Sequence, residues 1–73
     1  MSGDNRAMHI RLNGEDLAID TGSTIAALLA HQGLAGRRVA VEVNGEIVPR
    51  GQHASHVIAE GDRVEIVHAL GGG

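Results

Sequence analysis

The residues with the clearest chemical potential stand at the carboxyl end of the chain, which reads IVHALGGG. Three glycines there lead to a free carboxylate and add no side chains that could be buried. Chain ends are commonly frayed, so one hypothesis gives this tail no role. The other hypothesis makes the carboxylate of Gly73 a reactive group. The elements that precede the tail must decide between the two.

Histidines are the next candidates. His53 and His56 stand three residues apart in the segment HASH, so one helical turn could bring them together as metal ligands. No third ligand lies nearby and the chain has no cysteine, so surface histidines are the preferred interpretation and no metal site is predicted. His9 and His68 become neighbours if the first and last predicted strands pair, which would make a docking face sensitive to pH. Two half-exposed strand histidines are the simpler interpretation of that pair.

All six basic residues are arginines. Arg37 and Arg38, together with Arg11 and Arg50, are candidates for contact with an acidic groove on a partner. Ordinary solvated loop charges explain them equally well at this point. Because lysine is absent, Schiff-base chemistry and isopeptide bonds to the chain's own side chains are excluded.

The composition narrows the class of protein. The 73 residues make one domain with a core just large enough to fold. A net charge of −3 and the absence of aromatic residues argue against nucleic-acid binding, which uses basic faces and stacking. A chain this small rarely lines a sizeable catalytic pocket. No stretch approaches the roughly 20 apolar residues of a membrane span, and residues 1–7 lack the apolar region of a signal peptide. A cytoplasmic protein is expected.

Two hairpins and one helix are predicted in the first two thirds of the chain. Residues 8–12 alternate apolar and polar side chains, Asn13-Gly14 is a strong hairpin signal, and Leu17 and Ile19 mark the returning strand. A second alternating strand over residues 39–44 runs through the pair Asn44-Gly45 into a short segment, residues 46–48.

The predicted helix lies between the two hairpins. Ser23 or Thr24 can cap its N-terminus, and Gly33 stands where its C-cap should be. Its apolar stripe consists of Ile25, Leu28 and Leu29. Leu34 is expected to fold back onto that apolar side.

The last third of the chain shows less regular alternation of apolar and polar residues. Pro49 ends the short strand or places it at an edge. Residues 50–59 are irregular, with one helical turn predicted near residues 53–57. A final strand runs from Arg63 to Ala69, with Val64 and Ile66 pointing inward.

One helix with a single apolar stripe must cover one face of one sheet. Placing the last strand beside the first, in parallel, buries both of them. The arrangement is the ubiquitin-like β-grasp, an α+β fold in which a mixed sheet of four to five strands packs on one helix. We expect a disordered leader over residues 1–7, the β-grasp domain over residues 8–69 and a flexible tail over residues 70–73.

Four stretches carry a resemblance to a known family: IRLNGE, TIAALLA, VAVEVNGEIVPR and EGDRVEIVHALGGG. With these residues the chain resembles the thiamin-biosynthesis sulfur carrier proteins, and the resemblance spans Met8 to Gly73. The resemblance implies that a partner adenylates the terminal glycine carboxylate with ATP, that sulfur replaces the adenylate, and that the resulting thiocarboxylate gives its sulfur to the thiazole ring of thiamin.

The same resemblance assigns sites and partners. Gly73 would carry the sulfur, while Gly72, Gly71 and Leu70 would thread the partner's active site, where glycine avoids collisions with the walls. Four extended residues reach about 13 Å. The partners implied are an E1-like adenylyltransferase of the ThiF type, a thiazole synthase of the ThiG type, and a sulfur donor such as a cysteine desulfurase relay. The carrier itself is expected to bind no cofactor and to catalyse nothing, since ATP and Mg belong to the adenylating partner.

A docking surface is expected on the sheet face away from the helix. Ala40, Val67 and Ala69 would form a small apolar island there, and in ubiquitin-like folds that face often meets partners. The alternative is ordinary apolar surface, which every protein has.

Three other functions remain open. The small subunit of molybdopterin synthase is also a β-grasp sulfur carrier, although such proteins are usually longer and contain aromatic residues. A ubiquitin-like modifier would attach to lysines of other proteins. A binding module with an inert tail would work equally well without Gly73.

Overall fold

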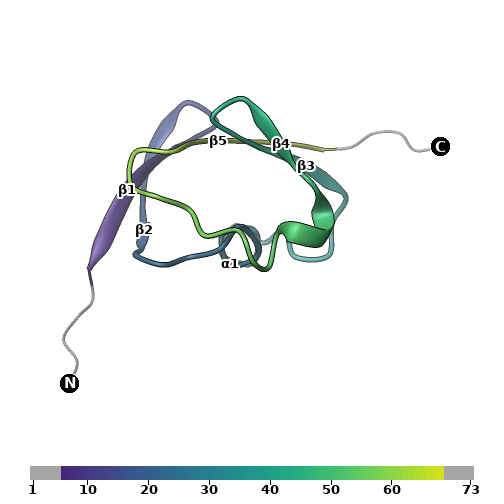
Figure 1. The fold of residues 1–73 in the computed structure, drawn as a ribbon, viewed down its shortest axis with the longest axis horizontal. Helices are drawn as coiled ribbons and strands as arrows, with labels where there is room; N and C mark the ends of the chain where they lie inside the picture. The colour runs from purple at the N-terminus through teal and green to yellow at the C-terminus, as the bar shows by residue number, and fades with distance from the viewer. Residues whose placement is uncertain (1–5, 69–73) are drawn as a thin grey trace, which may run out of the picture.

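A five-stranded mixed sheet with a single helix against one face forms the part of the chain that the structure describes, residues 6–68 of a computed structural model (Figure 1). The elements are, in chain order, β1 (Ala7–Leu12), β2 (Glu15–Asp20), α1 (Ile25–His31), β3 (Val39–Val43), β4 (Glu46–Val48), the 3-10 helix η1 (Arg50–Gln52) and β5 (Arg63–His68). The strand order is β2-β1-β5-β3-β4. β5 runs parallel to β1 and antiparallel to β3, as the predicted β-grasp requires.

Both predicted hairpins form at their Asn-Gly pairs. Asn13 and Asn44 have φ angles of 52° and 53°, and Gly14 and Gly45 follow with 85° and 88°. Two successive residues with positive φ are what a two-residue hairpin turn needs to match the twist of its strands. β1 begins one residue earlier than the alternation suggested, at Ala7 rather than Met8.

The N-terminus of α1 is capped by Thr24, one of the two predicted candidates. The Thr24 hydroxyl accepts a hydrogen bond of 3.1 Å from the backbone N–H of Ala27. Ser23 does not cap the helix, because its hydroxyl donates to the carbonyl of Asp20. The cap satisfies one of the free N–H groups at the helix start.

The C-terminus of α1 ends in a glycine motif. Gly33 has a φ of 76° and its N–H donates to the carbonyl of Ala30, while the N–H of Leu34 donates to the carbonyl of Leu29 at 2.7 Å. This pair of bonds is the Schellman pattern, which turns the chain back along the helix. Leu34 consequently packs against the core, as predicted.

The segment after β4 begins with a short helix that the sequence did not indicate. In η1 the carbonyl of Pro49 accepts the N–H of Gln52 at 2.8 Å, and one helical turn follows near the predicted place, where the carbonyl of Gln52 accepts the N–H of His56 at 2.9 Å. The carbonyls of His53 and His56 accept hydrogen bonds from the first two N–H groups of α1. The segment therefore forms short turns of its own and also caps the start of α1.

The core lies between the inner face of the sheet and α1, and it is built without aromatic side chains. The helix contributes its predicted stripe. The buried apolar residues are Met8, Ile10, Ile25, Leu28, Leu29, Val41, Val43, Val48, Ile58, Val64 and Ile66. Within residues 6–68, no helix is long and apolar enough to cross a membrane.

Candidate functional site

The predicted sulfur-carrying tail follows β5 directly. Gly73 and the tail residues Gly72, Gly71 and Leu70 lie outside the described residues, as does Ala69 of the predicted docking surface. The structure places the strand that leads to them: β5 lies between β1 and β3 and its last residue, His68, pairs with Val39.

The two described members of the predicted docking surface face each other across two strands. Ala40 of β3 pairs with Val67 of β5, on the sheet face away from α1. Val67 is 59% exposed and Ala40 is partly buried. Ile47 of β4, 68% exposed, stands on the next strand beyond β3, opposite Glu42. The exposed apolar surface near the end of β5 is therefore larger than the sequence suggested.

Two carboxylates stand directly opposite each other beside this apolar surface. Glu42 pairs with Glu65 across β3 and β5, one step along the same face from Ala40 and Val67. Like charges at directly opposite positions are destabilising in a sheet. A basic side chain of a partner would relieve that repulsion.

Asn13 holds β5 on the side of β1. Its backbone N–H donates to the carbonyl of Val64 at 2.9 Å, and its side-chain Oδ1 accepts the N–H of Ile66 at 2.8 Å. The side-chain oxygen thus accepts the hydrogen bond that a backbone carbonyl would accept if β1 continued beyond Leu12.

Asn44 holds β5 on the side of β3. Its backbone N–H donates to the carbonyl of Arg63 and its Oδ1 accepts the N–H of the same residue at 2.9 Å. Its Nδ2 donates to Asp62 Oδ1 at 3.0 Å, and Asp62 Oδ2 accepts the N–H of Ala59. Sequence reasoning identified both asparagines as turn residues and missed these bonds to β5. The signal available was the repeated choice of an amide at the first turn position.

The histidine predictions require two corrections. His9 and His68 are not neighbours, because the parallel register places the carbonyl of His9 against the N–H of Gly61 and places His68 opposite Val39. His53 is not a surface residue, since it is only 8% exposed.

His53 is buried because its side chain completes a hydrogen bond inside the fold. Its Nε2 lies 3.0 Å from the carbonyl oxygen of Val48. A carbonyl oxygen only accepts, so Nε2 carries a proton and donates. Among residues 6–68 there is no group of three or more His, Cys, Asp or Glu side chains that could hold a metal ion.

The chain is similar to several proteins of known name. Its residues 10–73 match the model of the ThiS family. It is 41% identical to the sulfur carrier protein ThiS of Bacillus subtilis, over 88% of this chain and 98% of that protein. It is also 44% identical to the thiazole synthase of Magnetococcus marinus and 42% identical to that of Paramagnetospirillum magneticum, but it spans only 20% of the length of either.

A solved structure has the same fold. The crystal structure of the thiamine biosynthesis protein ThiS from Geobacter metallireducens superposes with a TM-score of 0.78, at 30% identity, and covers 90% of this chain and 100% of that one. The family model, the full-length relative and the shared fold agree. This chain belongs to the ThiS family.

Proposed function

We propose that this protein is a sulfur carrier of thiamin biosynthesis and that the terminal carboxylate of Gly73 bears the sulfur. The observation that supports this proposal most directly is the extent of the family match, which runs through the last glycine. A module with an inert tail has no reason to keep the family pattern up to that residue.

The chemistry requires activation before sulfur can enter. A carboxylate resists nucleophilic attack because its negative charge repels the nucleophile. Its oxygen attacks the α-phosphate of ATP, which releases pyrophosphate and leaves an acyl adenylate. A sulfur nucleophile then attacks the carbonyl carbon and AMP leaves. If that nucleophile is a persulfide, the product is an acyl disulfide, and a thiol must reduce its S–S bond to free the thiocarboxylate.

The carrier contributes the carboxylate and its presentation, whereas the partners contribute the catalytic groups. Leu70, Gly71 and Gly72 would thread the partner's site, since glycine adds no side chain and accepts unusual backbone angles. ATP and Mg would bind to an E1-like adenylyltransferase of the ThiF type, and the sulfur would come from a donor such as a cysteine desulfurase relay.

The sulfur acceptor would be thiazole synthase. Two thiazole synthases contain a segment that resembles this chain over 90% of its length. In these proteins a carrier-like segment and a synthase share one polypeptide. Such a fusion supports the proposal that the carrier and thiazole synthase interact directly.

The apolar surface near the end of β5 would form part of the docking site for these partners. We assign this role to Ala40 and Val67, with Ala69 next along the chain. The exposure of Val67 and its pairing with Ala40 support the assignment.

Pyrophosphate exchange tests the activation step. The full-length protein, incubated with the adenylyltransferase, ATP and labelled pyrophosphate, should return label to ATP. The same protein with its C-terminal carboxylate converted to an amide should not, although it keeps every residue of the chain. Equal exchange by both proteins would show that the terminal carboxylate is not the reactive group.

A further inference from the structure

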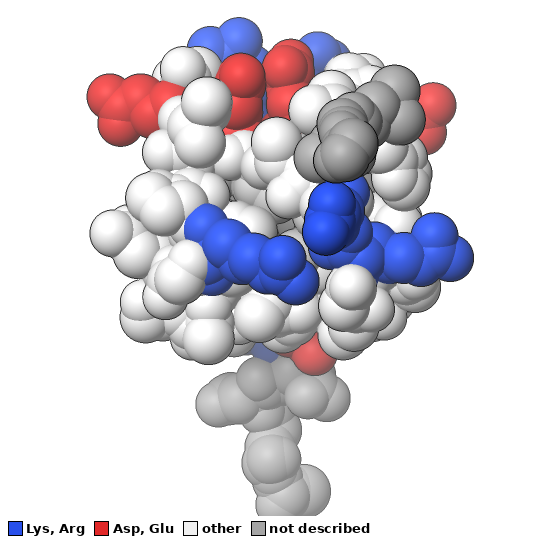
Figure 2. Space-filling model, turned by 90° about the vertical axis from the view of Figure 1, so that its right-hand side faces the viewer, with Lys and Arg blue, Asp and Glu red and all other residues white. Residues whose placement is uncertain are grey.

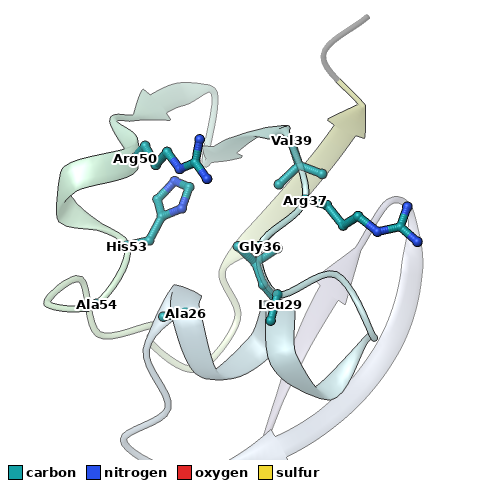
Figure 3. Close-up of a pocket in the computed structure, with 9 residues that line it drawn as sticks. Ala26, Leu29, Gly36, Arg37, Val39, Arg50, His53 and Ala54 are labelled. Atoms are coloured by element: carbon teal, nitrogen blue, oxygen red, sulfur yellow. The ribbon is translucent and has the colours of Figure 1, made fainter.

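A pocket with a basic rim lies on the side of the molecule where the strand before the tail ends. It has a volume of about 260 Å³ and lies between α1, the loop before β3 and the segment that begins with η1 (Figure 3). Its walls are largely small and aliphatic: Ala26, Leu29, Val39 and Ala54. Its volume is below the roughly 300–1,000 Å³ of typical small-molecule sites, which favours a single side chain as occupant.

Two arginines stand at the rim. Arg50 lies beside the imidazole of His53, and the side chain of Arg37 extends outward from the opposite edge (Figure 3). Because His53 Nε2 is already bonded to the carbonyl of Val48, the imidazole is held in place as part of the wall. An apolar centre with a charged rim is the usual anatomy of a protein interface.

The arginines of this region have no carboxylate partners in the described fold. Within residues 6–68 the structure contains one ion pair, which joins Arg11 to Asp16 at 3.5 Å on the sheet. Arg37, Arg38 and Arg50 therefore have no carboxylate partner among the residues that the structure describes. Figure 2 shows Arg side chains across the middle of this face and Asp and Glu side chains along its upper edge, with none between the arginines. The middle of the face is basic although the whole chain has a net charge of −3.

The pocket is also adjacent to the end of β5, the strand that precedes the tail in the chain. Val39, which lines the pocket, pairs with His68, the last described residue of β5. An enzyme that binds the tail is thereby brought within reach of the pocket, and the pocket lies on the helix side of the sheet rather than on the face of Ala40 and Val67.

We propose that this basic-rimmed pocket docks thiazole synthase, through a segment of that enzyme which presents an aliphatic side chain flanked by carboxylates. The inference rests on the proposed function, which supplies the identity of the partner. The pocket walls accommodate the aliphatic side chain, and Arg37 and Arg50 pair with the carboxylates. Complementary charge at the rim raises the rate of association and orients the two proteins.

Charge reversal and pocket filling test the proposal with purified proteins. Arg37→Glu and Arg50→Glu reverse the rim charge, while Ala54→Leu fills the pocket and leaves the charges intact. Arg6→Glu is the matched control, because it makes the same charge change just before β1, at the opposite side of the molecule (Figure 1). Binding to thiazole synthase is measured by calorimetry at low and physiological ionic strength.

Each pocket variant should weaken binding to thiazole synthase by about tenfold or more, and the loss for the two charge variants should shrink as salt rises. Arg6→Glu should bind within about twofold of the unchanged protein. All variants should retain pyrophosphate exchange with the adenylyltransferase, which shows that they fold and present the tail.

Two results would overturn the proposal. The pocket variants could bind thiazole synthase as well as the unchanged protein does, or Arg6→Glu could weaken binding as much as they do, which would reduce the effect to net charge. If the unchanged protein itself fails to bind thiazole synthase, the proposed function fails together with the docking site, and that outcome is distinct from the first two.

Discussion

The side-chain oxygen of Asn13 lies 2.8 Å from the backbone nitrogen of Ile66, in the strand that leads to Gly73. The backbone of Asn13 adds a second bond to the same strand, and Asn44 makes the corresponding pair of bonds from the other side. Each asparagine therefore has two structural roles. It adopts the positive φ angle of a hairpin turn, and its hydrogen bonds hold β5 in register with the neighbouring strand.

Replacing Asn13 should destabilise the fold in a graded way. Asn13→Gly tolerates the positive φ but removes the acceptor of a part-buried N–H, which should lower the free energy of unfolding by about 1–2 kcal/mol. Asn13→Ala adds the strain of a left-handed backbone, about another 1 kcal/mol. Asn13→Asp is the control, because it keeps both the acceptor and the turn preference and should stay close to the unchanged protein. Denaturant unfolding measures all three, and equal stabilities would show that the side-chain bond contributes nothing.

The elements of the sheet were predictable to different degrees. The hairpins followed from alternation and from Asn-Gly pairs, whose geometry is local. Ala40 and Val67 were expected only to share the outer face, and the structure shows that they also pair directly across β3 and β5. The separation of His9 from His68 could not be predicted from the sequence pattern. It depends on the register of β1 against β5, which is set by where β1 ends and where Asn13 bonds to β5.

The segment between β4 and β5 was the least predictable. Its backbone groups bond partly to one another in short turns and partly to the start of α1, and no local period reveals the second set of bonds. His53 illustrates the consequence. A histidine in a polar stretch suggests exposure, but its ring is buried because the carbonyl of Val48 lies within hydrogen-bond distance.

The outer face of the sheet yields a prediction about docking. Val67→Asp should weaken binding of the adenylyltransferase by about tenfold, since it places a charge at the centre of the apolar surface. Val57→Asp is a matched control, because Val57 is 57% exposed against 59% for Val67 and lies in the segment that bridges to the start of α1. Neither change touches the core, so both proteins should melt near the temperature of the unchanged one. Equal weakening by both variants, or by neither, would remove Val67 from the docking surface.

At the scale of the whole molecule, two surfaces differ in their polarity and charge. The outer sheet face combines apolar side chains with the opposed pair Glu42 and Glu65, whereas the side that carries Arg37 and Arg50 is basic. The last described residue of β5, His68, pairs with Val39 of the pocket wall and follows Val67 of the outer face in the chain. Such an arrangement suits the proposed function, in which one chain end meets more than one enzyme in turn.

The central claim is that Gly73 carries sulfur, and the mass of the intact protein after loading tests it most directly. The chain is incubated with the adenylyltransferase, ATP and a sulfur donor, beside the same protein with its C-terminal carboxylate converted to an amide. The account predicts a gain equal to the exchange of one oxygen for one sulfur, confined to the C-terminal fragment and absent from the amidated protein. An unchanged mass, with the adenylyltransferase active on a known carrier, would contradict the account and leave the tail without a chemical role.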